Sequence, residues 1–137
     1  MSNTLYIASD HAGFALKAEL IEFAQAQDLG THSAERCDYP DFANALAERV
    51  LKENARGILI CGSGIGMSIA ANRHKGIRAA LCTSGLEAEL ARKHNDANVL
   101  CLGARLIGID TAKECVQRFL NTAFEGGRHA ERVEKLE

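Results

Sequence analysis

The chain alternates short apolar runs with stretches of helical periodicity from one end to the other. The apolar runs predict strands at residues 5–8, 57–61, 78–81 and 99–102, with a weaker strand at 29–32. The stretches between them predict helices at residues 14–27, 41–53, 67–73, 86–94 and 111–122. Such alternation is typical of a parallel sheet covered by helices on both faces. We therefore predict an α/β protein: one three-layer α/β/α domain, residues 1–137, with a five-stranded, parallel, Rossmann-like sheet.

Local signals mark two of the helix starts. Asp41 follows Pro40, the only proline, and Asp110 is a predicted cap before Thr111. The segment Thr83-Ser84-Gly85 follows the third long strand, and no role is predicted for it.

Composition excludes several kinds of partner. A net charge of -2 gives the chain no general attraction for nucleic acid or for an anionic membrane. No apolar run approaches the roughly 20 residues of a membrane span. We predict a protein that binds neither nucleic acid nor membrane.

The five cysteines include no C-x-x-C pair, so neither a disulfide framework nor a zinc site is indicated. Reduced thiols suit the cytoplasm, and the amino terminus enters an apolar strand without a signal segment. We expect a cytoplasmic protein without a bound metal. We expect Cys82, Cys101 and Cys115 to be small core residues.

The remaining feature of note is the loop Cys61-Gly62-Ser63-Gly64-Ile65-Gly66, which joins a strand to a helix. Open α/β sheets place reactive groups at such strand ends. The loop lacks the lysine of a phosphate-binding P-loop, the spacing of a dinucleotide fingerprint and the arginine of a cysteine phosphatase. Three glycines are costly to order unless backbone approaches something closely. We predict an active-site loop with Cys61 as its reactive group.

Three further clusters are expected on the same side of the sheet: Ser9-Asp10-His11-Ala12-Gly13, His94-Asn95-Asp96 and Gly103-Ala104-Arg105. The carboxyl ends of parallel strands line one crevice, so we predict that these groups converge on Cys61. Simpler interpretations stay open for some of them. Asp10 is equally suited to cap a helix, and His11 and His94 to face solvent.

The tail, residues 124–137, breaks at Gly126-Gly127 and resumes as a short charged helix. Arg128 and Arg132 lie four residues apart and share one face of it. The segment has too little apolar surface to stand alone. Either it frays in solvent, or it lies across a partner subunit and points both arginines into a shared cleft.

Seven blocks in collinear order resemble the type B ribose-5-phosphate isomerase family, which also contains allose-6-phosphate and galactose-6-phosphate isomerases. They are Ser9-Asp10-His11-Ala12-Gly13, Asp38-Tyr39-Pro40-Asp41, Gly57 to Gly66, Gly76 to Ala79, His94 to Asn98, Leu102 to Arg105, and Phe124 to His129. The resemblance covers nearly the whole chain. It implies interconversion of D-ribose 5-phosphate and D-ribulose 5-phosphate without metal or cofactor, in a homodimer whose active sites lie between subunits.

The resemblance also implies catalytic roles. Cys61 would be the base that moves a proton between carbons 2 and 1 through an enediolate, and the amides of Gly62, Gly64 and Gly66 would stabilise the oxyanion. Ser63 would relay a proton between the sugar oxygens. His94 of the partner would open the furanose ring with Asp10 as its counterpart. Some relatives carry a glutamate base at the place of Met67, and its absence here favours the thiol.

Binding roles follow from the same resemblance. His11, Arg128 and Arg132 would bind the phosphate, Asn95 and Arg105 would complete the site from the other chain, and Tyr39 would contact the sugar. A six-carbon sugar phosphate and a noncatalytic phosphosugar-binding subunit stay open as alternatives. Pairing of dimers into tetramers also stays open.

Overall fold

The computed structural model describes residues 3–137, and within them it forms a five-stranded sheet. The strands are β1 (Leu5–Ser9), β2 (Gln27–Asp28), β3 (Arg56–Cys61), β4 (Ala79–Leu81) and β5 (Val99–Gly103). They lie in the order β2-β1-β3-β5-β4, and every neighbouring pair is parallel. The central pairs are in register from Leu5 opposite Arg56 to Ser9 opposite Ile60.

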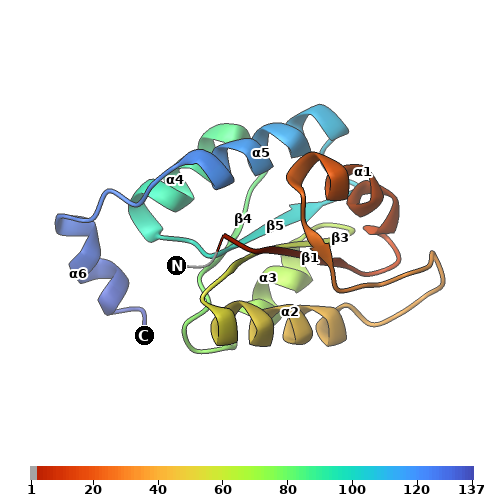
Figure 1. The fold of residues 1–137 in the computed structure, drawn as a ribbon, viewed down its shortest axis with the longest axis horizontal. Helices are drawn as coiled ribbons and strands as arrows, with labels where there is room; N and C mark the ends of the chain where they lie inside the picture. The colour runs from red at the N-terminus through yellow and green to blue at the C-terminus, as the bar shows by residue number, and fades with distance from the viewer. Residues whose placement is uncertain (1–2) are drawn as a thin grey trace.

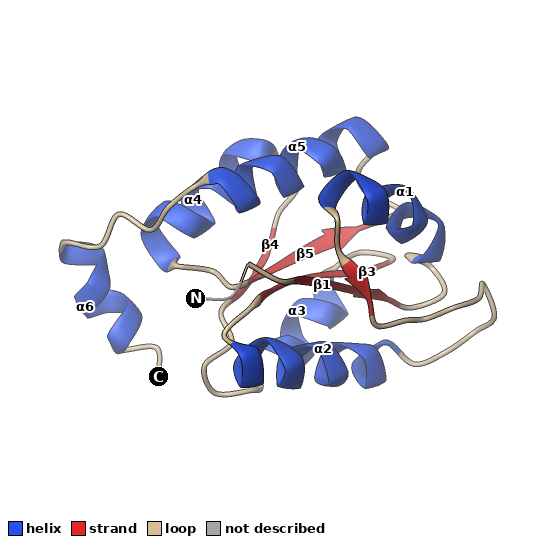
Figure 2. Cartoon of the chain, viewed as in Figure 1, coloured by secondary structure: helices blue, strands red, loops and turns tan. Residues whose placement is uncertain are grey.

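The described residues form six helices: α1 (Phe14–Ala24), α2 (Tyr39–Glu53), α3 (Ile65–Ala71), α4 (Gly85–Asn95), α5 (Ile109–Asn121) and α6 (Arg128–Glu134). Helices α1, α4 and α5 cover one face and α2 and α3 the other (Figures 1 and 2). The predicted three-layer α/β/α architecture is therefore confirmed. No helix within residues 3–137 has the length and apolarity to cross a bilayer.

Successive side chains of β3 point to opposite faces of the sheet and pack in two separate cores. Ile58 and Ile60 pack in the cluster under α1, α4 and α5, whereas Leu59 and Cys61 pack in the cluster under α2 and α3. Successive strand residues point to opposite faces, so a strand covered on both sides is apolar throughout. Cys61, the last residue of β3, is thereby held at the edge of the second core.

The order of the strands fixes the place of a crevice. β1 pairs with β2 on one side and with β3 on the other, so the chain reverses its winding direction between these two neighbours. In open parallel sheets the crevice outside the carboxyl ends of such strands is the usual binding site. Ser9 and Cys61 end β1 and β3 at this point.

The first helix and the edge strand depart from prediction. Helix α1 ends at Ala24, not Gln27, because Gln25 adopts a left-handed conformation with φ of 53°. The edge strand then forms at Gln27–Asp28, not at 29–32. Only these two residues pair regularly with β1, but the predicted segment still lies along β1, because the Leu29 amide donates to the Ile7 carbonyl and the Thr31 amide to the Ser9 carbonyl.

The helix starts are also shifted. Helix α2 begins at Tyr39, with Pro40 and Asp41 in its first turn. Helix α5 begins at Ile109 and is capped by Gly108, so the prediction of Asp110 as the cap was wrong; Asp110 lies in the first turn instead. An acidic residue is favourable there as well, because it faces the positive end of the helix dipole.

The tail forms the short helix that the sequence predicted, α6. It stands beyond α4, at the left of Figure 1, and its main contact is with α4. Arg128 and Arg132 are exposed on it.

Candidate active site

A cavity of about 590 Å³ opens at the carboxyl ends of β1 and β3. Its polar wall consists of Asp10, His11, Tyr39, Cys61, Gly62, Ser63, Gly66 and Arg105, and its apolar rim includes Ile65, Ile69 and Leu106. The structure thus brings the Asp10 and Arg105 clusters together with Cys61.

Cys61 lies at the inner wall of the cavity with 5% of its surface exposed. The amide of Gly64 donates a hydrogen bond of 3.1 Å to its sulfur. Such a bond is strongest when the sulfur is a thiolate, the form that accepts protons and attacks electrophiles. The turn requires glycine at this position, because Gly64 has φ of 77° and any Cβ would lie 2.5 Å from the side chain of Leu81.

The loop after Cys61 is tied to the end of β5. The amide of Ala104 donates to the Cys61 carbonyl at 2.9 Å, and that of Arg105 donates to the Gly62 carbonyl at 2.9 Å. These bonds place the exposed Arg105 side chain beside the loop of its own chain. The resemblance implied that Arg105 comes from the other chain, so this expectation is corrected.

Asp10 and His11 follow β1 directly. Asp10 is buried, and its carboxylate accepts a 3.1 Å hydrogen bond from the amide of Gly13, just before α1. It therefore closes a turn and lines the cavity at once. The Nδ1 atom of His11 accepts a 3.2 Å hydrogen bond from the Cys37 amide. A neutral His11 ring consequently carries its proton on Nε2, where it can donate to a ligand.

Tyr39, the first residue of α2, forms the wall next to the end of the loop. Its ring lies against Gly66 so closely that any Cβ there would be 2.5 Å from it. A second cavity of about 700 Å³ shares Asp10, His11 and Tyr39 and extends along residues 36–41. Together the two cavities can take a ligand longer than one sugar ring.

His94 and Asn95 do not belong to this cavity in the same chain. The prediction that they share a side of the sheet with Cys61 was wrong, because a helix between parallel strands runs back to their amino ends. Asn95 ends α4, and the chain enters β5 only four residues later, at Val99. Arg128 and Arg132 on α6 are likewise outside the cavity.

His94 instead contacts the tail. Its ring stacks on that of His129 with a centroid distance of 4.4 Å and an interplanar angle of 16°. Burial, followed by the neighbouring His94 and Arg128, lowers the pKa of His129 below its usual range. His129 was not among the predicted site residues, although it directly follows Arg128 in the sequence.

One cluster in residues 3–137 has metal-ligand chemistry. Ligand atoms of His94, Glu125 and His129 lie within 4.8 Å of one another. Arg128 and Arg132 both act on His129 electrostatically and lower its pKa. The two arginines oppose a bound cation and the Glu125 carboxylate favours one, so we assign no metal to this cluster.

The remaining cysteines confirm their predicted core positions. Burial raises the pKa of Cys82 to about 12 and that of Cys115 to about 11, and it raises the pKa of Cys101 as well. All three stay protonated thiols at neutral pH. Cys37 is half-buried and lies beside His11, with 4.0 Å between its sulfur and Nδ1.

Thr83-Ser84-Gly85 has a structural role. Ser84 caps α4 by accepting a 3.2 Å hydrogen bond from the Glu87 amide, and the carboxylate of Glu87 accepts 2.7 Å bonds from the hydroxyl and amide of Thr83. These bonds lower the pKa of Glu87. The segment is therefore a helix-capping device outside the cavity.

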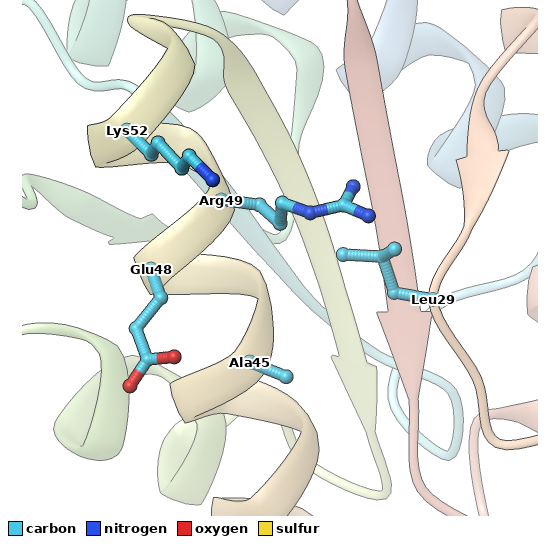
Figure 3. A pocket seen from close by; sticks show the side chains of 5 residues that line it. All are labelled: Leu29, Ala45, Glu48, Arg49 and Lys52. Carbon is cyan, nitrogen blue, oxygen red and sulfur yellow. The ribbon is translucent and has the colours of Figure 1, made fainter.

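A separate pocket of about 390 Å³ lies between α2 and the segment after β2 (Figure 3). It is lined by Leu29, Ala45, Glu48, Arg49 and Lys52. Arg49 extends from α2 towards Leu29 in Figure 3, with its guanidinium carbon 5.1 Å from the centre of the Tyr6 ring. Its lining offers no thiol, hydroxyl or imidazole, so we place no chemistry there.

A thiol at the crevice of a doubly wound sheet, facing an acid and an imidazole, defines an α/β enzyme that moves protons on a small polar molecule. Residues 5–136 match the family model described as Ribose/Galactose Isomerase. The chain belongs to this family and is a sugar isomerase. The predicted resemblance is confirmed.

Individual relatives agree with this assignment. The chain is 47% identical to ribose-5-phosphate isomerase B of Escherichia coli K12, over 93% of this chain and 89% of that protein. It superposes with a TM-score of 0.95 on ribose-5-phosphate isomerase B of Clostridium thermocellum, at 48% identity over 97% of this chain and 94% of that chain. The chain also superposes on type B ribose 5-phosphate isomerase of Trypanosoma brucei with a TM-score of 0.96. The two are 45% identical over 99% of this chain and 97% of that chain. These matches confirm the fold over almost the whole length.

Proposed function

We propose that the chain interconverts D-ribose 5-phosphate and D-ribulose 5-phosphate through an enediolate, with Cys61 as the base. The observation that carries the proposal is the hydrogen bond from the Gly64 amide to the Cys61 sulfur, inside a cavity that also holds Asp10 and Ser63. The names of the relatives from Escherichia coli and Clostridium thermocellum support the choice of sugar.

In this proposal the loop performs the proton transfer. The thiolate of Cys61 takes the proton from carbon 2 and returns it to carbon 1. The Ser63 hydroxyl oxygen accepts a 3.2 Å hydrogen bond from the Ile65 amide, which leaves its own hydrogen free to move between the two sugar oxygens. The amides of Gly62 and Gly66 line the same cavity and offer donors to the enediolate oxygen.

The sugar and its phosphate occupy the two connected cavities. Tyr39, which packs beside Gly66 at the end of the loop, contacts the sugar. His11 donates from Nε2 to the phosphate, and Arg105 of the same chain adds a charged donor. No cofactor is assigned a role.

We further propose a homodimer in which each active site takes His94, Asn95, Arg128 and Arg132 from the partner. Two observations support this. These side chains lie at the amino end of the sheet, away from the Cys61 of their own chain. The cavity rim exposes Ile65, Ile69 and Leu106, which are 50%, 53% and 59% exposed and would be covered by a second subunit. The tail, residues 124–137, then packs on the partner.

A mixing experiment tests the shared site. Cys61→Ala and His94→Asn homodimers should each be inactive. Unfolding and refolding them together should restore about a quarter of wild-type activity, because half of the dimers would carry one intact site. No restored activity, or a hydrodynamic mass of one chain, would contradict the shared dimer.

Turnover of three substrates tests the sugar. Ribose 5-phosphate, allose 6-phosphate and galactose 6-phosphate should be compared at equal concentrations with a chelator present. We expect the five-carbon sugar to be preferred. Preference for a six-carbon sugar would keep the mechanism and change the substrate, and no turnover of any would favour a noncatalytic binding subunit.

The compartment is part of the same proposal. All five cysteines are unpaired. Free thiols persist in reducing compartments, so we place the enzyme in the cytoplasm.

A further inference from the structure

The segment that precedes α6 is fastened to the end of α4 by specific bonds. The Glu125 amide donates to the Lys93 carbonyl at 3.1 Å. Arg92, only 2% exposed, donates to the carbonyls of Thr122 at 3.2 Å and Ala97 at 2.7 Å. Its guanidinium also pairs with Asp96 at 2.8 Å. Lys93 directly precedes His94, so these bonds hold the tail against the turn that carries the imidazole.

The docked tail delivers His129 onto His94. The two rings are nearly parallel, and the side chain of His129 is 12% exposed. The Glu125 carboxylate lies 3.7 Å from the Nε2 atom of His129. A planar partner at this distance restricts rotation of the His94 ring, which an isolated loop imidazole would not experience.

We propose that His129 is a positioning residue, which holds the His94 imidazole in the orientation needed to open the sugar ring. The proposal rests on the proposed function. The charged and titratable groups around His129 are His94, Glu125, Arg128 and Arg132. Burial and His94 keep the pKa of His129 low, so at neutral pH the two rings stack without like-charge repulsion.

The chemistry of the two sugar phosphates allows ring opening to be measured separately from proton transfer. Ribose 5-phosphate is a furanose in which the carbon 4 oxygen is bonded to carbon 1. Opening removes the proton of the carbon 1 hydroxyl, breaks the bond between carbon 1 and the ring oxygen, and protonates that oxygen. Ribulose 5-phosphate has its carbon 5 oxygen phosphorylated and forms no such ring. Removal of its carbon 1 proton therefore needs Cys61 but no ring opening.

Two variants and two reactions test the proposal. His129→Ala removes the stacked ring, and His129→Phe keeps a planar ring without ionisable nitrogen. The first reaction is turnover of ribose 5-phosphate. The second is exchange of the carbon 1 hydrogen of ribulose 5-phosphate with deuterium oxide, followed by proton NMR.

We expect His129→Ala to slow ribose 5-phosphate turnover by roughly 10- to 100-fold, the cost of a misplaced catalytic group, while exchange stays within about twofold. His129→Phe should recover most of the turnover. Equal losses in both reactions, no loss in either, a loss confined to exchange, or failure of Phe to recover turnover would each overturn the proposal.

A structural readout separates this proposal from the proposed function. The ring current of His129 should shift the His94 ring protons upfield in the NMR spectrum, and the shift should vanish in His129→Ala and persist in His129→Phe. If wild-type protein shows neither turnover nor exchange, the proposed function fails. If the wild-type His94 protons show no such shift, the positioning role fails by itself.

Discussion

The backbone amide of Gly64 points at the sulfur of Cys61, 3.1 Å away, inside a cavity that the carboxyl ends of β1 and β3 create. The pairing exists because a buried strand ends in cysteine and the next turn requires a left-handed residue. This hydrogen bond holds the thiol in position for proton transfer before any ligand binds.

Gly64→Ala should destabilise the fold more than a glycine substitution in open space. The new Cβ would meet Leu81 and the backbone of Leu102, and the left-handed conformation adds a cost of about 1–2 kcal/mol. Gly126→Ala is the matched control, because Gly126 also has positive φ but has nothing within 4 Å. Urea denaturation should show the larger loss for Gly64→Ala, and equal losses would contradict the packing account.

Thiol labelling should divide the cysteines into two groups. Iodoacetamide should modify Cys37 and Cys61 in the native protein, since one is half-buried and the other lines the cavity. Cys82, with its pKa raised to about 12 by burial, and the buried Cys101 and Cys115 should react only after unfolding. Mass spectrometry of the labelled peptides measures this. Native labelling of any of the three core thiols would argue against the packing described.

Lys17→Met should cost about 2–4 kcal/mol of unfolding free energy. The Lys17 ammonium is 1% exposed and lies 2.6 Å from both the Asp28 carboxylate and the Thr31 carbonyl. Its removal leaves the Asp28 carboxylate without its ammonium partner, with only the Gly30 amide and His32 nearby, and leaves the Thr31 carbonyl without its donor. Adding Asp28→Asn should recover part of the loss, because the amide oxygen can still accept from Gly30 and the charge is gone. No recovery in the double variant would show that charge pairing is not the main contribution.

His129 should make stability depend on pH. Burial and the neighbouring His94 and Arg128 lower the pKa of His129 in the folded state, so below about pH 6.5 the unfolded chain binds more protons than the folded one. The unfolding free energy should therefore fall as pH falls through this window. Urea denaturation of His129→Gln at a series of pH values should show a shallower fall, and an identical pH profile would contradict the assignment.

The sequence was sufficient to predict the architecture where the local signals were strong. The apolar runs of β1, β3 and β5 and the glycine turn after Cys61 have no other consistent interpretation, and the three core thiols followed from the same pattern. The two-residue strand β2 carries no comparable signal, and Leu29 drew the prediction into the loop beyond it. Asp110 was mistaken for a cap because an acidic residue is favourable at either position.

The sequence predicted correctly which residues line the Cys61 cavity at the strand ends, but it placed His94 and Asn95 at the wrong end of the sheet. Asp10, His11, Ser63 and Arg105 meet Cys61 because strand ends share an edge of the sheet, and Tyr39 joins them from the start of α2. His94 and Asn95 lie at the other end, since α4 runs back across the sheet before β5 begins. In the proposed homodimer the partner supplies them, and no local sequence pattern records contacts between two chains.

The proposed reaction depends on Cys61 as the base. The decisive measurement is deuterium exchange at carbon 1 of ribulose 5-phosphate by Cys61→Ala, with ligand binding followed by calorimetry and Cys37→Ala as control. We predict that exchange is lost while the dissociation constant changes by less than about threefold, and that Cys37→Ala retains both. Near-normal exchange by Cys61→Ala would contradict the mechanism.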